Sequence, residues 1–168
     1  MNIRAKKKVA IIGAGKIGID LLYKVRRSEY LDCVLVSGRS LSSEGMSIAK
    51  SLGVTTSDGG IDSILSQIDE IDIVFDASSA AAHQVHWDLL KDKNIGVIDM
   101  TPSSLGNSII PAVNIALAKT QTHINMISCG GQSSIPIINA ISEVVEEIAY
   151  VELVSSIASK SAGAATRF

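Results

Sequence analysis

Short apolar runs alternate along the chain with segments in which apolar residues recur at helical spacing. Six runs have the composition of strands buried on both faces: 8–12, 31–37, 54–56, 71–77, 95–100 and 123–128. Four intervening segments have the spacing of amphipathic helices: 17–27, 44–52, 61–67 and 80–90. Strands that alternate with helices form parallel sheets covered on both faces. The pattern therefore predicts an α/β fold of the Rossmann type, a doubly wound parallel sheet with strand 71–77 near its centre.

The pattern changes after residue 100. Because proline disfavours helical geometry in the residue before it, Pro102 stops the fifth strand, and a loop is predicted over 101–122. After the sixth strand, Ser133 and Ser134 are natural N-caps and Pro136 suits a first turn. These residues predict a helix over 134–147.

A β-like run over 150–159 follows that helix. A chain of 168 residues is long enough for one nucleotide-binding domain with a short appendage. We therefore expect a dinucleotide-binding domain over 1–130 and the beginning of a second, α+β domain over 131–168.

The first turn carries three glycines. They lie within the segment Gly13, Ala14, Gly15, Lys16, Ile17 and Gly18. A dinucleotide pyrophosphate needs backbone N–H groups that it can approach closely and a helix N-terminus whose dipole favours negative charge. A strand precedes these glycines and a helix follows them, which is the context that the dinucleotide fingerprint requires. The alternative is that the glycines only close a tight turn between strand and helix.

The second strand is followed by Ser37, Gly38, Arg39 and Ser40. An acidic residue is expected at this position when the adenosine ribose of the cofactor has free hydroxyls. A guanidinium and a hydroxyl suit a 2'-phosphate instead, so both NADP and NAD stay open as cofactors. Arg39 is equally well explained as a solvated loop charge.

Cys129 lies between the end of the sixth strand and a helix, followed by two glycines. Ligands of open α/β sheets bind at the carboxyl ends of the strands, and a nearby helix N-terminus favours the thiolate form of a cysteine. Cys129 is therefore a candidate nucleophile, although a cysteine near a strand is commonly a buried structural residue. Cys33, within the second strand, is assigned that structural role. A thiol beside a nicotinamide indicates oxidation of an aldehyde through a thiohemiacetal and a thioester.

Composition narrows the function further. Fifteen basic and seventeen acidic residues give a net charge of −2, which offers no electrostatic basis for binding nucleic acid or an anionic membrane. No apolar run approaches the roughly 20 residues that cross a bilayer, and no segment has the pattern of a signal peptide. The two cysteines are interpreted as free thiols in a reducing compartment, so we expect a cytoplasmic protein.

Other polar residues are assigned smaller roles. His83, His86 and His123 are scattered along the sequence without a matching cysteine or carboxylate pattern, so no metal site is predicted. Asp76 and Asp99 end central strands, where each is expected to cap a turn and not to transfer protons.

Five stretches resemble the acetylating acetaldehyde dehydrogenases that partner 4-hydroxy-2-oxovalerate aldolase. They are KVAIIGAGKIGIDL, IDIVFDASSAAAH, IDMTPSSLG, NMISCGGQSSIPI and SSIASKSAGAATR. The resemblance implies conversion of acetaldehyde, or another short-chain aldehyde, with coenzyme A and NAD to acetyl-CoA. It also implies that the aldehyde arrives through a channel from the aldolase, and that the full-length protein is a homo-oligomer.

The resemblance also implies residue roles. Cys129 would be the acyl-thioester nucleophile, residues 14–17 would bind the NAD pyrophosphate, and Ser78 and Ser79 would lie beside the cofactor, although a helix N-cap explains these two serines equally well. A second loop would contact NAD through Ser161, Ala162, Gly163, Ala164, Ala165, Thr166 and Arg167.

This chain departs from the family in two respects. Many members carry an acidic residue in place of the Gly38-Arg39-Ser40 segment. Members also run to roughly twice this length, so residues 131–168 would be an incomplete catalytic and dimerisation domain. Two alternatives stay open: a non-catalytic dinucleotide-binding module, and a semialdehyde dehydrogenase that uses phosphate in place of coenzyme A.

Overall fold

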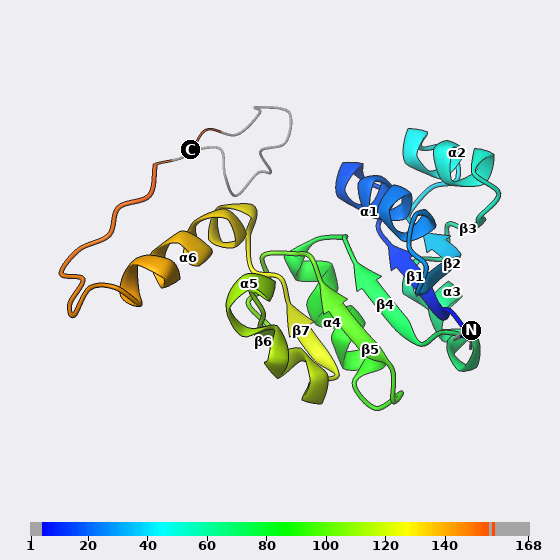
Figure 1. Cartoon of the computed structure of the whole chain (residues 1–168). Helices are drawn as coiled ribbons and strands as arrows, with labels where there is room; N and C mark the ends of the chain where they lie inside the picture. The colour runs from blue at the N-terminus through cyan, green and yellow to red at the C-terminus, as the bar shows by residue number, and fades with distance from the viewer. Residues whose placement is uncertain (1–4, 155, 157–168) are drawn as a thin grey trace.

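The computed structural model describes residues 5–154 and residue 156. Its described residues form one parallel sheet in the order β3-β2-β1-β4-β5-β7-β6 (Figure 1). The strands are β1 (Lys7–Ile12), β2 (Leu31–Ser37), β3 (Thr55–Ser57), β4 (Ile73–Asp76), β5 (Gly96–Asp99), β6 (Asn107–Ser108) and β7 (His123–Asn125). The α-helices are α1 (Lys16–Arg26), α2 (Glu44–Ser51), α3 (Gly60–Leu65), α4 (Ala80–Leu90), α5 (Pro111–Asn114) and α6 (Cys129–Ser142), with 3-10 turns η1 (Ile68–Glu70) and η2 (Ile115–Thr120).

Two apolar clusters cover the two faces of the sheet. Successive side chains of a strand point to opposite faces, so Val9 and Ile11 of β1 pack with α1 and α2, through Leu22 and Met46 among others. Ala10 and Ile12 belong to a second cluster that includes Ile64 of α3 and Leu90 of α4. Burial on both faces explains why the strands are continuously apolar, and it confirms the predicted doubly wound α/β fold.

Most of the predicted elements are present. The strands predicted at 8–12 and 31–37 and the helix at 80–90 correspond to β1, β2 and α4. β4 occupies the middle of the seven-stranded sheet, as its apolar density predicted. None of the helices in the described part of the chain has the length and apolar character needed to cross a membrane.

The loop predicted over 101–122 is wrong in part, because this segment contains β6, α5 and η2. Asn107 and Ser108 pair with Ile124 and Asn125 of β7, a contact between distant segments that local patterns do not reveal. Pro111 begins α5, where its missing N–H costs no hydrogen bond.

The predicted start of the last helix is also wrong. α6 begins at Cys129, because the Ser128 hydroxyl caps it by accepting from the Gly131 N–H at 3.1 Å. The hydroxyls of Ser133 and Ser134 instead donate to the Gly130 carbonyl, at 3.0 and 2.7 Å. Pro136 therefore lies inside the helix, which ends at Ser142.

The β-like run predicted over 150–159 forms no strand in its described part, residues 150–154 and 156. A strand requires hydrogen bonds to a neighbouring strand, and these residues pair with neither edge of the described sheet. Residues 155 and 157–159 lie outside the described residues.

Candidate functional site

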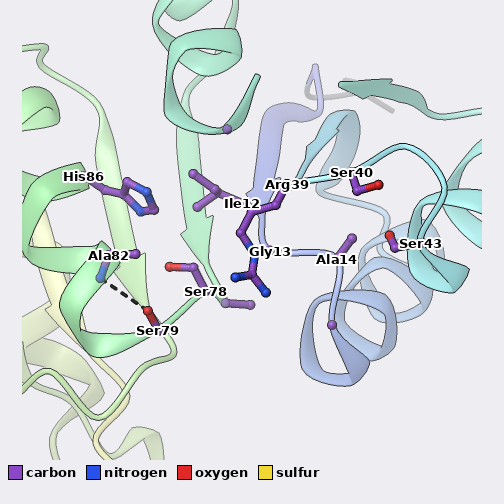
Figure 2. A pocket seen from close by; sticks show the side chains of 14 residues that line it. Ile12, Gly13, Ala14, Arg39, Ser40, Ser43, Ser78, Ser79, Ala82 and His86 are labelled. Carbon is purple, nitrogen blue, oxygen red and sulfur yellow. Dashed lines mark hydrogen bonds between the residues drawn. The ribbon is translucent and has the colours of Figure 1, made fainter. Parts of the chain in front are cut away.

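A cleft of about 550 Å³ lies at the carboxyl ends of β1, β2 and β4 (Figure 2). The strand order reverses between β1 and β4, which is where open α/β sheets bind dinucleotides. The volume falls within the range of ordinary small-molecule sites. The cleft is lined by Ile12, Gly13, Ala14, Gly15, Gly38, Arg39, Ser40, Ser43, Gly60, Ala77, Ser78, Ser79, Ala82 and His86.

The three glycines of the first turn differ in what a side chain would meet. A Cβ at Gly13 would lie 2.5 Å from the Ala77 carbonyl oxygen, and φ there is +103°. A Cβ at Gly18 would lie 1.9 Å from the Gly13 carbonyl oxygen. At Gly15 nothing of the protein lies within 4 Å. Closing a tight turn therefore accounts for Gly13 and Gly18, whereas a Cβ at Gly15 would point into open space beside the cleft.

The start of α1 suits an anion. Gly15 is the N-cap residue and has no side chain with which to bond the first N–H groups of the helix. Those N–H groups carry the positive end of the helix dipole. Lys16 and Ile17 begin the helix and are both exposed. The residues present at this turn fit the pyrophosphate of a dinucleotide.

Ser78 and Ser79 follow β4. Ser78 lies on the cleft and is held by Asp76, whose Oδ1 accepts from the Ser78 backbone N–H at 3.0 Å. The Ser79 hydroxyl caps α4 by accepting from the Ala82 N–H at 3.3 Å (Figure 2). The N-cap explanation therefore applies to Ser79, whereas Ser78 lines the cleft with its hydroxyl bonded to Asp76.

Cys129 is exposed and is the first residue of α6. It follows β7, so it lies at the same edge of the parallel sheet as the Gly13 turn, although it is not among the residues that line the cleft. β1 and β7 are three strand spacings apart, roughly 14 Å. β7 belongs to the half of the sheet that lies on the other side of β1 from β2 and β3.

The loop before Cys129 is held by side-chain hydrogen bonds. The Asn125 Oδ1 atom accepts from the Ile127 N–H at 2.7 Å, and Gln132 donates to the Ile109 carbonyl at 2.7 Å. Ile127 has a φ of +51°, which is costly for a β-branched residue. This fixed turn determines where the thiol emerges from the sheet.

Cys33 has a different environment. It is half-buried in β2, and its thiol donates to the Leu35 carbonyl at 3.7 Å. Burial raises the pKa of the Cys33 thiol to about 11. Cys33 is therefore protonated at neutral pH and is a poor nucleophile.

A buried polar network lies behind the cleft. Asp76 Oδ2 bonds to Nδ1 of His83 at 2.8 Å and to Nδ1 of His86 at 2.7 Å. Burial alone would raise the pKa of Asp76, but the hydrogen bonds from His83, His86 and Ser78 outweigh it and hold that pKa well below its usual value. Because His86 also lines the cleft, the network reaches the cleft wall.

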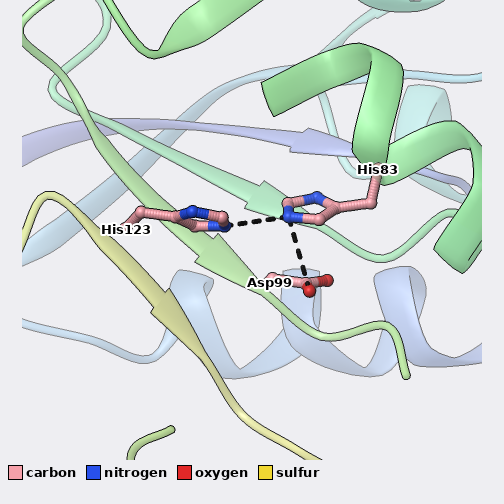
Figure 3. Close-up of side chains that lie close together, drawn as sticks. All are labelled: His83, Asp99 and His123. Atoms are coloured by element: carbon pink, nitrogen blue, oxygen red, sulfur yellow. Dashed lines mark hydrogen bonds and ion pairs between the residues drawn. The ribbon is translucent and has the colours of Figure 1, made fainter. Parts of the chain in front are cut away.

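The network continues to β5 and β7. Nε2 of His83 lies 2.9 Å from Nε2 of His123 and 3.4 Å from Asp99 Oδ2 (Figure 3). Trp87 stacks on His123 with ring centroids 3.9 Å apart. Burial, and then the charge of His83, lower the pKa of His123. Asn125 donates to Asp99 Oδ2 at 2.6 Å, which connects the network to the loop that carries Cys129.

The three histidines, although scattered along the sequence, therefore lie close together in the fold. The fold brings together His83 and His123, which lie 40 positions apart in the sequence. Among the described residues, these two histidines and Asp99 form a group that could hold a metal ion. Their ligand atoms all lie within 4.8 Å of one another. The hydrogen bond between the two imidazoles explains the same closeness without an ion.

The structure adds residues that sequence patterns did not indicate. His86 lies on the cleft wall, and Gly45 lets α2 begin against the first turn, since a Cβ there would lie 2.0 Å from the Ala14 carbonyl oxygen. A glycine inside a helical pattern was the available signal for Gly45. The predicted second NAD-contacting loop, residues 161–167, lies outside the described residues.

Comparison with known proteins identifies the family. An acetaldehyde dehydrogenase of Pectobacterium atrosepticum is 53% identical over 168 residues, which cover 99% of this chain and 57% of that protein. One from Desulfitobacterium hafniense is 50% identical over 98% of this chain and 55% of that protein. Residues 129–168 match the family model described as prokaryotic acetaldehyde dehydrogenase, dimerisation. The chain belongs to the acetaldehyde dehydrogenase family.

Residues 2–100 also match the family model described as shikimate / quinate 5-dehydrogenase. The chain spans a little over half the length of the curated relatives it matches.

Solved structures share the fold. An aspartate semialdehyde dehydrogenase with NADP from Candida albicans has a TM-score of 0.64 at 14% identity, covering 83% of this chain and 47% of that one. Aspartate semialdehyde dehydrogenase II from Vibrio cholerae has a TM-score of 0.62 at 17% identity, covering 84% of this chain and 48% of that one.

Proposed function

We propose that this chain forms the coenzyme-binding and nucleophile-bearing part of a CoA-acylating aldehyde dehydrogenase, whose substrate is acetaldehyde or another short-chain aldehyde. One observation carries the proposal: an exposed cysteine opens a helix at the same edge of the sheet as a glycine turn that fits a pyrophosphate. The choice of acetaldehyde as substrate rests on the names of the relatives.

The proposed first step is addition of the Cys129 thiolate to the aldehyde carbonyl carbon, which forms a thiohemiacetal and places negative charge on the former carbonyl oxygen. In the described part of the chain, the backbone N–H groups of Cys129 and Gly130 at the start of α6 have no hydrogen-bond acceptor. Such N–H groups stabilise a developing oxyanion. Cys129 can therefore serve as nucleophile and take part in oxyanion stabilisation.

The second step oxidises the thiohemiacetal carbon to a thioester. When bound, NAD⁺ or NADP⁺ accepts the hydride that leaves this carbon. The coenzyme A thiol then loses its proton to solvent and its sulfur attacks the thioester carbon. The bond from this carbon to the Cys129 sulfur breaks, so acyl-CoA leaves and Cys129 returns as the thiolate. Positioning in this scheme depends on the turn at Gly13–Gly18 and on the loop that Asn125 holds in front of Cys129.

Three further proposals concern the whole protein. The dimerisation model over residues 129–168 supports a homo-oligomer. Association with 4-hydroxy-2-oxovalerate aldolase rests on the family resemblance alone. A cytoplasmic location is supported by the presence of two free thiols, Cys33 and Cys129, and no disulfide between them.

Mass spectrometry of the acyl-enzyme tests the proposal. The protein is incubated with acetaldehyde and oxidised dinucleotide in the absence of coenzyme A, and an acetyl group is expected on the peptide that contains Cys129. Adding coenzyme A should remove this acetyl group, whereas adding inorganic phosphate should not. Cys129→Ser should abolish the adduct and Cys33→Ser should leave it unchanged. Dinucleotide binding without any adduct on Cys129 would instead support a non-catalytic binding module.

A further inference from the structure

The residues after β2 differ from those of a site for an unphosphorylated ribose. In Rossmann domains the end of this strand meets the adenosine ribose, and a carboxylate there hydrogen-bonds the ribose hydroxyls. Here β2 ends at Ser37, which is buried, and its hydroxyl donates to the Gly60 carbonyl at 2.7 Å. Gly38 follows and has no side chain. No aspartate or glutamate is among the described residues that line the cleft.

A cation occupies the place of that carboxylate. Arg39 is exposed, and its side chain extends into the cleft toward the Gly13 turn (Figure 2). Among the residues that the structure describes, Arg39 has no ion-pair partner within 4.0 Å and no side-chain hydrogen bond. Among the described residues that line the cleft, Arg39 is the one whose side chain is charged at every ordinary pH. A guanidinium binds a phosphate through two parallel N–H donors, which makes Arg39 suited to this anion.

Hydroxyl groups surround the same position. Ser40 and Ser43 both line the cleft. The Ser43 oxygen accepts from the Met46 N–H at 3.4 Å as the cap of α2, so its proton is free to donate to a ligand. Ser40 is bonded to Ser42 at 2.8 Å, which fixes its hydroxyl in the loop. The nearest carboxylate along the chain, Glu44, lines the neighbouring depression between α1 and α2 and not this cleft.

We propose that Arg39, with Ser40 and Ser43, forms a 2'-phosphate site and that this chain prefers NADP(H) to NAD(H). The inference rests on the proposed dinucleotide-binding function, which it makes more specific. The 2'-phosphate of the adenosine ribose is the one group that distinguishes the two cofactors, and it would lie at the end of β2. A carboxylate at this position would repel that phosphate, whereas Arg39 attracts it.

Equilibrium binding tests the inference without requiring turnover. Dissociation constants of the chain are measured by titration calorimetry for NADPH and NADH, and for adenosine 2',5'-bisphosphate and 5'-AMP, which differ only in the 2'-phosphate. From the usual strength of charge-assisted hydrogen bonds, we expect each phosphorylated ligand to bind roughly ten- to a hundredfold more tightly than its partner.

Variants assign the preference to its residues. Arg39→Ala should weaken NADPH binding roughly tenfold or more and leave NADH binding within about twofold. Ser40→Asp should weaken NADPH and not NADH. The matched control, Arg27→Ala, removes an exposed arginine at the end of α1 that lines neither depression, and it should change neither affinity.

Three results would overturn the inference: NADH binding as tightly as NADPH, Arg39→Ala weakening both ligands equally, or no binding of either dinucleotide. The first two leave the proposed aldehyde chemistry intact. Conversely, selective NADPH binding without an acyl adduct on Cys129 would refute that chemistry and support the 2'-phosphate site.

Discussion

Gly15 and Gly18 are predicted to affect different properties when each is replaced by alanine. A Cβ at position 18 would lie 1.9 Å from the Gly13 carbonyl oxygen, a backbone atom that cannot rotate away. Overpacking of this kind costs about 1–3 kcal/mol and occasionally more, so we expect Gly18→Ala to lose about 3 kcal/mol of stability. For a chain of this size that loss corresponds to a fall in Tm of roughly 6–12 °C.

Gly15→Ala meets no protein atom within 4 Å, and its φ of −76° is allowed for alanine. The weaker N-cap costs under about 1 kcal/mol, and the stiffer unfolded chain returns about 0.4–1 kcal/mol. We therefore expect an almost unchanged Tm. The new methyl group would enter the proposed pyrophosphate site, so dinucleotide affinity should fall at least roughly tenfold.

Thermal unfolding by circular dichroism and NADPH titration of the two variants check this pair. Gly53→Ala is not a suitable control, because its φ of +77° would itself cause strain. Ser51→Ala, on the exposed end of α2, is suitable and should change neither measurement by much. The reasoning is refuted if Gly15→Ala binds NADPH as tightly as the parent, or if Gly18→Ala is as stable as the parent.

Two further predictions concern the buried network. The pKa of Asp76 is depressed in the folded chain, so the stability it contributes is complete above the unfolded value of about 3.9 and is lost as pH falls below it. Urea unfolding between pH 3 and 7 should therefore show an acid-dependent loss that Asp76→Asn reduces, and equal pH slopes for the two proteins would refute this. Asn125→Ala removes the hydrogen bonds to Asp99 and Ile127 and should cost roughly 1–3 kcal/mol. The same variant should also change the alkylation rate of Cys129, and an unchanged rate would show that Asn125 does not position the loop.

Local signals account for the parts of the fold that the sequence predicted. The run 8–12, the glycine turn and the amphipathic segment after it each specify a structure from a few neighbouring residues. The errors occur where distant segments decide the outcome. Asn107–Ser108 becomes a strand only because β7 lies beside it, and residues 150–154 lack such a partner within the described sheet.

The end of β7, which was predicted as the sixth strand, shows a different limit of prediction from sequence. Ser128, Ser133 and Ser134 are all residues that cap helices, so the composition does not choose among them. The choice of Ser128 depends on the loop that Asn125 and Gln132 fix against Ile109. This choice brings Cys129 into the first turn of α6 itself, without intervening glycines.

The candidate site was predictable in its backbone and not in its polar interior. Spacing alone indicated the glycine turn and the unusual Arg39. The buried network joins Asp76, His83, Asp99 and His123, whose separations in sequence carry no periodic signal. The parallel order of β4, β5 and β7, together with the position of α4, brings these residues together.

The central claim is that the Cys129 sulfur faces the nicotinamide end of a dinucleotide anchored at the Gly13 turn. Its most direct test is the rate at which iodoacetamide alkylates Cys129, followed by mass spectrometry, with Cys33 as an internal unreactive thiol because its pKa is raised to about 11. Saturating NADPH should slow alkylation of Cys129 at least severalfold, whereas adenosine 2',5'-bisphosphate, which lacks the nicotinamide half, should not. An alkylation rate that NADPH leaves unchanged, or that both ligands slow equally, would contradict the claim.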